Sequence, residues 1–160
     1  MLKLLQGTEF PGAPDAALQR QPAGFDLTVA SVGIPGSDGA LDLTNANRLI
    51  PELINLAWPA DGPLVLHPGG YVVTYNEEVA VPLDCAAIVL PRSSLMRCGA
   101  VLHSALWDPG YKGRGQGLLT VFNDLSLYPN ARIGQIVFLA LERNVDEGYQ
   151  GQYQGENIKS

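Results

Sequence analysis

The sequence predicts an all-β fold, a sandwich or a jelly-roll-like barrel of about ten short strands. Its 160 residues include 18 glycines and 12 prolines, which favours many short strands joined by turns over a few long helices. Short apolar runs recur along the chain, and turn residues separate them at regular intervals. The length suits one domain with a sizeable core, so we expect a single domain over residues 1–160.

Charge and cysteine content narrow the function classes. The net charge of −6 provides no basic field for a nucleic acid or an anionic membrane, so we expect neither partner. No apolar run approaches the roughly 18 residues of a membrane span. The apolar run in the first residues, MLKLLQG, is too short for a signal peptide. Cys85 and Cys98 lack metal-ligand spacing, which predicts buried, inert thiols in a reducing compartment. The sequence therefore predicts a soluble, cytoplasmic protein.

The N-terminal part of the chain predicts one clear strand. Residues 1–20 are mixed, with an edge strand or a short helical start followed by a loop. Apolar and polar residues alternate over 21–32, which predicts a strand with Asp26 on its polar face. Gly24 just before it permits a close backbone approach. One interpretation of Asp26 is a surface carboxylate that caps this turn.

The next part predicts loops and a hairpin. Residues 34–61 are loop-rich, and 43–50 could hold one helical turn. Short apolar runs at 64–66 and 71–75 flank an HPGG turn, which predicts a hairpin. His67 at the mouth of this hairpin is expected to be structural or exposed.

Two short strands and a short helix are expected next. The strands cover 79–81 and 86–90, and residues 92–97 then open a helix with Ser93 or Ser94 near its N-cap. Serine hydroxyls, free amides and flanking arginines would form a site for phosphate oxygens. A capped helix with surface arginines is the alternative.

The last part predicts two long strands and a polar tail. A tight Asp-Pro-Gly turn follows the apolar segment 101–107, and strands are expected at 118–122 and 133–141. The loop GRGQG between strands is not a dinucleotide fingerprint, because no βαβ unit surrounds it. Residues 144–160 are polar, Gly-rich and aromatic, which is typical of a mobile flap or a disordered end.

Several of these segments together resemble a known family. PRSSLMRCG, DPGYKG and RIGQIVF, in this order and spacing, resemble successive motifs of the dUTPase and dCTP deaminase superfamily, and deaminase-like dUTPases of archaeal type in particular. QPAGFDL resembles the first motif of that family, and GQYQGEN resembles the C-terminal lid of its deaminase-like branch. The resemblance implies a distorted jelly roll (β-clip, dUTPase-like), a homotrimer with sites at subunit interfaces, and a nucleoside triphosphate bound with Mg²⁺. The lid would be residues 144–160.

Position 120 distinguishes between the reactions of this superfamily. The deaminases carry a glutamate there, three residues before an asparagine, because deamination needs a carboxylate to shuttle protons. Counting back from Asn123 gives Thr120, and no glutamate occurs between Glu78 and Glu142. We therefore predict a dUTP diphosphatase, in which water attacks the α-phosphate of dUTP to give dUMP and pyrophosphate. Such an enzyme limits uracil incorporation into DNA and supplies dUMP for dTMP synthesis.

Two other functions remain open. The first is a dCTP deaminase or a bifunctional deaminase and diphosphatase. The second is a non-catalytic homologue that senses nucleotides.

The resemblance implies a role for each matching residue. Asp108 would orient the attacking water and contact the 3′-hydroxyl, and Tyr111 would lie beneath the sugar and exclude a 2′-hydroxyl. Asp26 would help to hold the Mg²⁺ hydration shell through water, with no protein cage around the metal. The phosphate-binding residues would be Arg92, Ser93, Ser94, Arg97 and Gln135.

The sequence gives weaker evidence for the residues that bind the base and for the lid residues. Uracil would be bound largely by backbone groups of 101–104 and 118–120, which makes His103, Leu119 and Thr120 candidates. His103 could instead simply fill space. Candidates in the lid are Tyr149, Tyr153 and Gln154.

Overall fold

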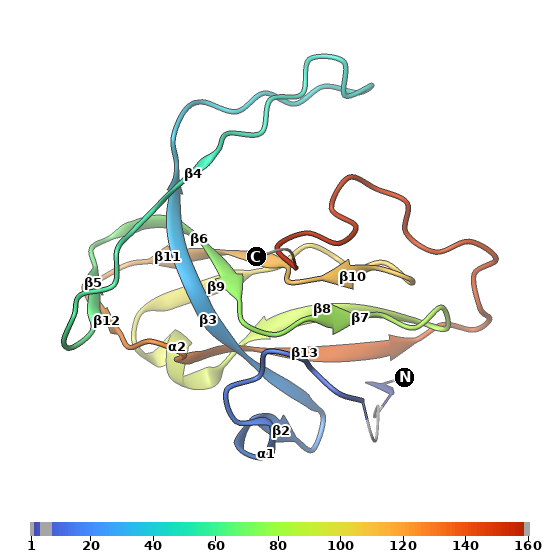
Figure 1. Ribbon diagram of the computed structural model, residues 1–160, viewed down its shortest axis with the longest axis horizontal. Coiled ribbons are helices and arrows are strands. Elements are labelled where there is room, and N and C mark those ends of the chain that lie inside the picture. Colours follow the sequence, from blue (N-terminus) through green and yellow to red (C-terminus); the bar gives the residue numbers. More distant parts are fainter. Residues whose placement is uncertain (1, 4–7, 159–160) are drawn as a thin grey trace.

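The computed structural model describes residues 2–3 and 8–158. Within them the protein is mostly β-structure, which confirms the all-β prediction. Figure 1 shows the strands curling around a common interior into a barrel-like body, with two short helices on its outside. The helices are α1 Ala16–Gln19 and α2 Ser93–Arg97. The strands are β1 Leu2–Lys3, β2 Arg20–Gln21, β3 Gly24–Pro35, β4 Leu53–Asn55, β5 Leu64–Leu66, β6 Gly69–Tyr75, β7 Val79–Ala80, β8 Cys85–Pro91, β9 Ala100–His103, β10 Lys112–Gly113, β11 Gln116–Val121, β12 Leu125–Leu127 and β13 Arg132–Ala140.

One nine-stranded sheet organises the body. Strands β1, β13, β3, β6, β11 and β9 follow one another in hydrogen-bonded order, β2 and β4 also pair with β3, and β8 pairs with β13. The remaining strands form two small sheets, β10 with β7 and β12 with β5. Strand β13 is central, because β8 pairs along one of its edges while β3 and β1 share the other.

The core is filled by strand residues and stacked aromatic rings. The apolar residues Phe25, Leu27, Val29 and Val32 of β3 are buried, but so are its polar residues Asp26 and Thr28, so both faces of this strand are covered. Phe25 stacks on Phe10, with ring centroids 4.0 Å apart. Trp107 contacts Tyr75 at 6.2 Å and Tyr111 at 5.1 Å between centroids. These contacts attach the turn that carries Tyr111 directly to the core.

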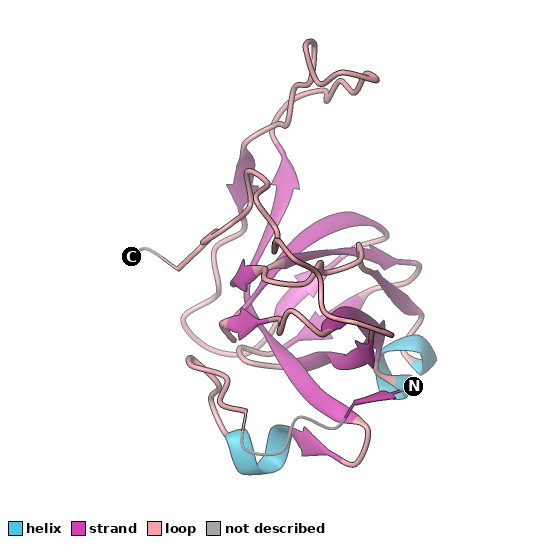
Figure 2. Ribbon diagram, turned by 90° about the vertical axis from the view of Figure 1, so that its right-hand side faces the viewer, coloured by secondary structure: helices cyan, strands magenta, loops and turns pink. Residues whose placement is uncertain are grey.

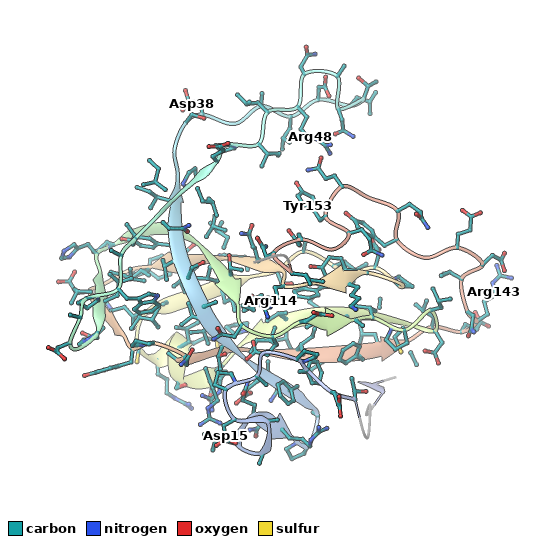
Figure 3. All side chains as sticks on the ribbon, viewed as in Figure 1. Asp15, Asp38, Arg48, Arg114, Arg143 and Tyr153 are labelled. Atoms are coloured by element: carbon teal, nitrogen blue, oxygen red, sulfur yellow. The ribbon has the colours of Figure 1, made fainter. Side chains whose placement is uncertain are left out.

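A long hairpin arm, residues 35–53, stands away from the body (Figures 1 and 2). Strands β3 and β4 pair at its base. The arm exposes apolar side chains, with Leu41 81% and Leu43 100% exposed. Arg48 on the arm donates a hydrogen bond to Gln152 Oε1 of the C-terminal tail, and Figure 3 shows the two segments facing each other.

Two local predictions for the N-terminal half are wrong. The stretch before residue 20 holds α1 where a loop was expected, because Asp15 Oδ1 accepts a hydrogen bond from Leu18 N at 3.0 Å and caps the helix. Residues 43–50 form no helical turn but the tip of the arm, which an isolated bridge between Ala40 and Leu49 closes.

The predicted hairpin of 64–66 with 71–75 is also wrong. Strand β5 pairs with β12, while β6 pairs with β3 on one edge and β11 on the other. The HPGG segment therefore links two different sheets, since longer partners occupy both edges of β6. His67 is exposed, and its Nδ1 lies 2.9 Å from Asp124 Oδ1.

The strands expected in the second half are present as β7, β8, β11 and β13. Cys85 is buried as predicted, but Cys98 is exposed because it caps the end of α2 at the surface. Neither helix in the described residues has the length and apolar character that crossing a bilayer requires.

A buried carboxylate connects three segments of the body. Glu77 is fully buried, and its Oε1 accepts hydrogen bonds from Gln19 Nε2 at 2.7 Å and Thr28 Oγ1 at 2.6 Å. Its Oε2 accepts from Thr28 N at 3.0 Å. Burial raises the pKa of Glu77, and these donated hydrogen bonds oppose the shift. Gln19 Nε2 also donates to Asp26 O at 2.8 Å, so this network supports the strand that carries Asp26.

Replacing the Glu77 carboxylate should destabilise the folded protein. In Glu77→Ala three buried donors lose their acceptor, and we expect the free energy of unfolding to fall by about 3 kcal/mol. Urea denaturation followed by tryptophan fluorescence measures the change. Glu52→Ala removes an exposed glutamate of the arm and serves as the control, with an expected change within about 0.5 kcal/mol. Equal effects of the two substitutions would contradict the role of Glu77.

Candidate functional site

Four polar side chains gather where β3, β13 and the end of β8 lie side by side. Asp26 of β3 pairs in register with Gln135 of β13, and Gln135 pairs in turn with Leu90 of β8. Arg92 follows β8, and Arg132 opens β13. We call Asp26, Arg92, Arg132 and Gln135 the arginine cluster.

Asp26 is the centre of the arginine cluster. Its Oδ2 lies 3.1 Å from Arg92 Nε and 3.2 Å from Arg132 Nη1, and its Oδ1 accepts from Gln135 Nε2 at 3.3 Å. Asp26 is only 1% exposed, so its interpretation as a surface carboxylate is wrong. A buried carboxylate needs charged and hydrogen-bonding partners, and these three side chains supply them.

The two arginines retain capacity for a further anion. Their side chains are 29% and 27% exposed, whereas Asp26 is enclosed. Each guanidinium has five N–H donors in a fork that matches phosphate oxygens, and Asp26 engages only part of them. The arginine cluster is therefore suited to bind phosphate while its buried charge stays compensated.

Helix α2 places the neighbouring polar residues beside this cluster. The helix is confirmed, but its N-cap is Arg92 and no side chain caps it, so the expected serine cap is wrong. Ser93 and Ser94 lie in the first turn instead, where their side chains are exposed together with that of Arg97. Buried Leu95 anchors the helix and leaves these polar groups facing solvent.

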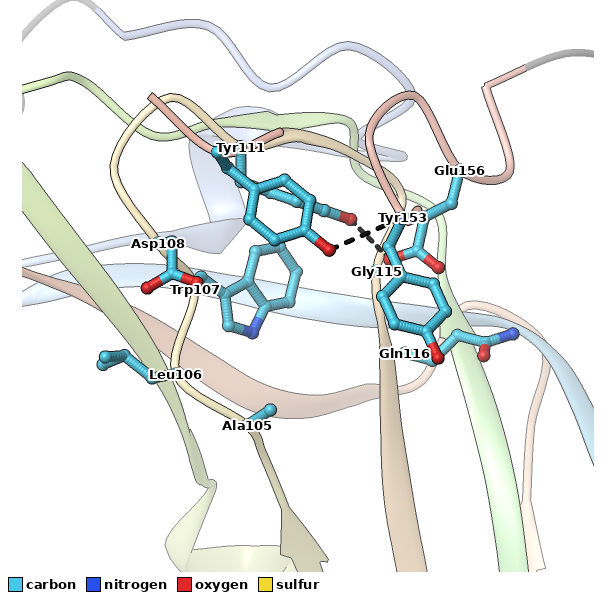
Figure 4. A pocket seen from close by; sticks show the side chains of 10 residues that line it. Ala105, Leu106, Trp107, Asp108, Tyr111, Gly115, Gln116, Tyr153 and Glu156 are labelled. Carbon is cyan, nitrogen blue, oxygen red and sulfur yellow. Dashed lines mark hydrogen bonds between the residues drawn. The ribbon is translucent and has the colours of Figure 1, made fainter. Parts of the chain in front are cut away.

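A pocket lies at the turn that follows β9. Figure 4 shows Tyr111 lying over Trp107, with Asp108 on one side and Glu156 of the tail on the other. The pocket encloses about 110 Å³. Sites that enclose a whole small ligand measure roughly 300–1,000 Å³. In this chain alone, the pocket has room for part of a nucleotide.

The C-terminal tail packs against the same turn. Tyr149 N donates to Pro109 O at 2.8 Å. Gln154 Oε1 accepts from Lys112 N at 2.8 Å, and its Nε2 donates to Gly110 O at 2.9 Å. Both Tyr149 and Tyr153 line the pocket. All three lid candidates therefore lie at the pocket or its turn.

The pocket is acidic. Asp108 is exposed at its edge, Glu156 is half-buried, and no lysine or arginine lines it. Burial, reinforced by the hydrogen bond to Glu156, raises the pKa of Tyr111, so its hydroxyl remains a donor. Burial also raises the pKa of Glu156, and the hydrogen bond from Tyr111 opposes that shift.

The strand pair expected to bind the base is present. Strands β9 and β11 place His103 opposite Leu118, and Val101 opposite Thr120. Leu119 is fully buried, so its side chain does not face a ligand in this chain. His103 is exposed. Thr120 is partly buried and carries a hydroxyl where a deaminase needs a carboxylate.

The arginine cluster and the pocket are separate within this chain. They share no residue, and no hydrogen bond or ion pair among residues 2–3 and 8–158 joins them. The motifs predict that the phosphate-binding residues and Asp108 act on the same nucleotide. The fold of one copy does not bring these residues together.

Two residues of these groups were missed by sequence reasoning. Arg132 is a polar residue at the start of an otherwise apolar strand, three residues before Gln135, and that position was the available signal. Glu156 lies within GQYQGEN, which resembled the lid, but no pattern distinguished it from the residues around it.

Comparison with known proteins agrees with the motifs. The family model of dCTP deaminase-like proteins matches residues 6–141. A protein of Methanosarcina acetivorans, named a probable deoxyuridine 5′-triphosphate nucleotidohydrolase, is 43% identical, and the match covers 98% of this chain and 94% of that protein. The deoxyuridine 5′-triphosphate nucleotidohydrolase of Methanocaldococcus jannaschii is 39% identical, with 86% and 88% covered.

Solved structures share the fold. The 2′-deoxycytidine 5′-triphosphate deaminase from Agrobacterium tumefaciens aligns with a TM-score of 0.56 at 21% identity, covering 81% of this chain and 42% of that chain. Native EIAV dUTPase aligns with a TM-score of 0.51 at 18% identity, covering 92% and 95%. These likenesses confirm the dUTPase-like jelly roll that the motifs implied.

The contact between Tyr111 and Glu156 can be tested by titration. We expect the Glu156 carboxyl to titrate above the ordinary value of 4.5, because burial disfavours its charged form. In Tyr111→Phe the carboxylate loses a hydrogen-bond donor, so its pKa should rise further. Carbon-detected NMR of the glutamate side chains across pH 3–9 measures both values. A Glu156 pKa that falls or stays unchanged in Tyr111→Phe would contradict the contact.

Proposed function

The chain belongs to the dCTP deaminase-like family, and from this premise we propose that it is a dUTP diphosphatase, which hydrolyses dUTP to dUMP and pyrophosphate. Relatives at 43% and 39% identity carry the name deoxyuridine 5′-triphosphate nucleotidohydrolase, and they support this activity. The observation that carries the choice is Thr120. A deaminase needs a carboxylate at that position on β11, and the chain has none.

Asp108 is proposed to position the attacking water. Its exposed carboxylate lies at the edge of the pocket, within reach of solvent and beside Tyr111. The water oxygen bonds to the α-phosphorus and gives its proton to the carboxylate. The bond from the α-phosphorus to the bridging oxygen breaks, and pyrophosphate leaves with the electron pair. Positioning and charge neutralisation supply most of the acceleration in such reactions.

The other residues are assigned to binding. Arg92 and Gln135 of the arginine cluster, with Ser93, Ser94 and Arg97 of α2, bind the phosphates. Tyr111 lies beneath the deoxyribose, where a 2′-hydroxyl would clash. Backbone groups of β9 and β11 bind uracil. Support comes from the partly exposed guanidinium groups and from the pocket that Tyr111 lines.

We propose that the complete site forms between copies in a homotrimer. The pocket holds Asp108 but no cation, and the arginine cluster holds cations but lies apart from the pocket. A second copy would supply the missing half. The exposed apolar side chains of the arm, Leu41 and Leu43 among them, offer surface for such an association.

Mg²⁺ is proposed as the cofactor, bound to the triphosphate with its waters retained. The described residues contain no group of three or more His, Cys, Asp or Glu side chains that could hold a metal directly. Asp26 already pairs with two arginines and accepts hydrogen bonds from two glutamines, Gln21 and Gln135, so it fits a contact through water better than direct coordination. Bound Mg²⁺ would neutralise charge on the phosphates.

The tail, residues 144–160, is proposed as a lid within a single domain. Tyr149 and Tyr153 line the pocket, and Gln154 holds the tail to the turn beneath it. We assign the protein to the cytoplasm, with a small nucleotide and no nucleic acid as its partner. The net charge of −6 supports the absence of a nucleic-acid partner.

Replacing Asp108 should abolish dUTP hydrolysis. Asp108→Asn keeps the shape of the side chain but cannot take a proton, and we expect kcat to fall by about 10²–10⁴-fold. Pyrophosphate release from dUTP with Mg²⁺ measures the loss. Asp124→Asn removes another exposed aspartate, one that pairs with His67, and should leave the rate unchanged.

The same assay separates the alternatives. Wild-type protein is incubated with dUTP, dCTP and dTTP separately, and the products are resolved by chromatography. Ammonia release from dCTP would contradict the assignment based on Thr120. Tight binding of dUTP without any product would favour a nucleotide sensor.

Mixing two inactive variants tests the shared site. Asp108→Asn and Arg92→Ala each inactivate every site of their own homotrimer. In trimers assembled from equal amounts of both, about one quarter of the sites receive an intact Asp108 from one copy and an intact Arg92 from its neighbour. Co-expressed and co-purified variants should therefore regain about a quarter of the wild-type rate. No recovery in mixed trimers, with mass spectrometry confirming the mixture, would place both residues in one copy's site.

A further inference from the structure

Neighbouring aromatic rings hold the ring of Tyr111 on two sides. It meets Trp107 edge-on, with centroids 5.1 Å apart and an interplanar angle of 74°. It meets Tyr149 of the tail at 5.8 Å and 67°. Tyr111 itself is only 6% exposed. These contacts pack against the ring of Tyr111, and its hydroxyl end is held by a separate contact.

Glu156 holds the hydroxyl end. Tyr111 Oη donates to Glu156 Oε1 at 2.8 Å, the contact drawn in Figure 4. Gly113 makes room for this hydroxyl, because a Cβ there would lie 2.4 Å from Tyr111 Oη. A larger residue at position 113 would therefore displace the hydroxyl from the carboxylate.

The backbone holds Glu156 in place. Glu156 O accepts from Arg114 N at 3.0 Å, and Gly155 N donates to Lys112 O at 2.8 Å. Asn157 Nδ2 donates to Arg114 O at 2.9 Å. Residues 155–157 are thus hydrogen-bonded to residues 112–114, which follow Tyr111, and these bonds hold the Glu156 carboxylate against the tyrosine hydroxyl. Its position does not depend on one flexible side chain.

We propose that Glu156 is a positioning residue that fixes the ring of Tyr111 and thereby sharpens the discrimination between deoxyribonucleoside and ribonucleoside triphosphates. This inference rests on the proposed function, in which Tyr111 lies beneath the sugar. Exclusion of a 2′-hydroxyl by steric contact requires that the ring of Tyr111 stays in one position. A ring free to tilt at its hydroxyl end would open space for the extra oxygen, and the hydrogen bond to Glu156 prevents that tilt.

A plainer role for Glu156 makes a different prediction. If Glu156 only anchors the tail, its loss loosens the lid for every substrate, and the KM for dUTP and for UTP rises by the same factor. If Glu156 fixes Tyr111, its loss mainly favours UTP. The ratio of kcat/KM for dUTP to that for UTP therefore separates the two roles.

The experiment measures this ratio in the wild type and three variants, with thermal unfolding to confirm that each is folded. We expect Glu156→Ala to lower the ratio about tenfold, the size of one hydrogen bond. Glu156→Gln keeps an acceptor oxygen for Tyr111 Oη and should lower it by less than about threefold. Glu142→Ala removes an exposed carboxylate just before the tail and should leave the ratio unchanged.

Tyr111→Phe provides the partner in a double-mutant cycle. It keeps the ring but removes the hydroxyl, so it should lower the ratio as much as Glu156→Ala does. The double variant Tyr111→Phe/Glu156→Ala should then be no worse than either single variant, because both remove the same contact.

The outcomes distinguish this inference from the function it rests on. Hydrolysis of dUTP by the wild type with an unchanged dUTP-to-UTP ratio in Glu156→Ala would overturn the positioning role alone. Additive losses in the cycle would overturn it as well. No hydrolysis of dUTP by the wild type would overturn the proposed function together with this inference.

Discussion

The buried charge of Asp26 is the constraint on which the arginine cluster depends. Taking a carboxylate out of water costs several kcal/mol unless cations and donors replace the lost hydration. Arg92, Arg132 and Gln135 replace it, with a further hydrogen bond from Gln21. Arg92 follows β8, while Arg132 and Gln135 lie on β13, which pairs with β8. A slip of one residue in β13 would turn Gln135 to the other face and deprive Asp26 of that hydrogen bond. Sheet register and charge compensation therefore require each other.

The pocket beside Asp108 depends on the space that glycines leave for aromatic rings. Residues 113–117, GRGQG, follow the turn that carries Tyr111, and their glycines leave room for aromatic groups. A Cβ at Gly115 would lie 2.5 Å from the ring of Trp107. A Cβ at Gly117 would lie 2.5 Å from Tyr75 Oη. Most of this segment is strand and not the expected loop, because Gly113 ends β10 and Gln116 opens β11. Its glycines are adapted to closely packed rings, which gives a structural reason for its composition.

The sequence predicted the strands with a clear apolar pattern. It missed strand pairings and side-chain contacts between residues that are far apart in the chain. Strands β3, β8 and β13 were found because their apolar runs are long enough to show a period. The hairpin at 64–75 failed because turn chemistry is local, while the choice of partner for β6 is made by β3 and β11. Asp26 sits at a polar position of an alternating strand, and only the arginines brought by two other segments explain its burial. The contact of Glu156 with Tyr111 spans 45 residues, so no local pattern could indicate it.

The distribution of charge argues for association of copies under the proposed function. A nucleoside triphosphate needs cations at its phosphates, yet the described residues that line the pocket beside Asp108 are mostly apolar or aromatic, with two carboxylates and no lysine or arginine among them. The arginines that could neutralise the phosphates are held at Asp26, in a group that makes no contact with the pocket. Under the proposed function, one copy offers a sugar pocket without cations and a phosphate site apart from it. The joining of these two surfaces from different copies in the proposed trimer would place a cationic group opposite Asp108. Assembly would then be a condition for the chemistry, because the fold of a single chain keeps the two kinds of group apart.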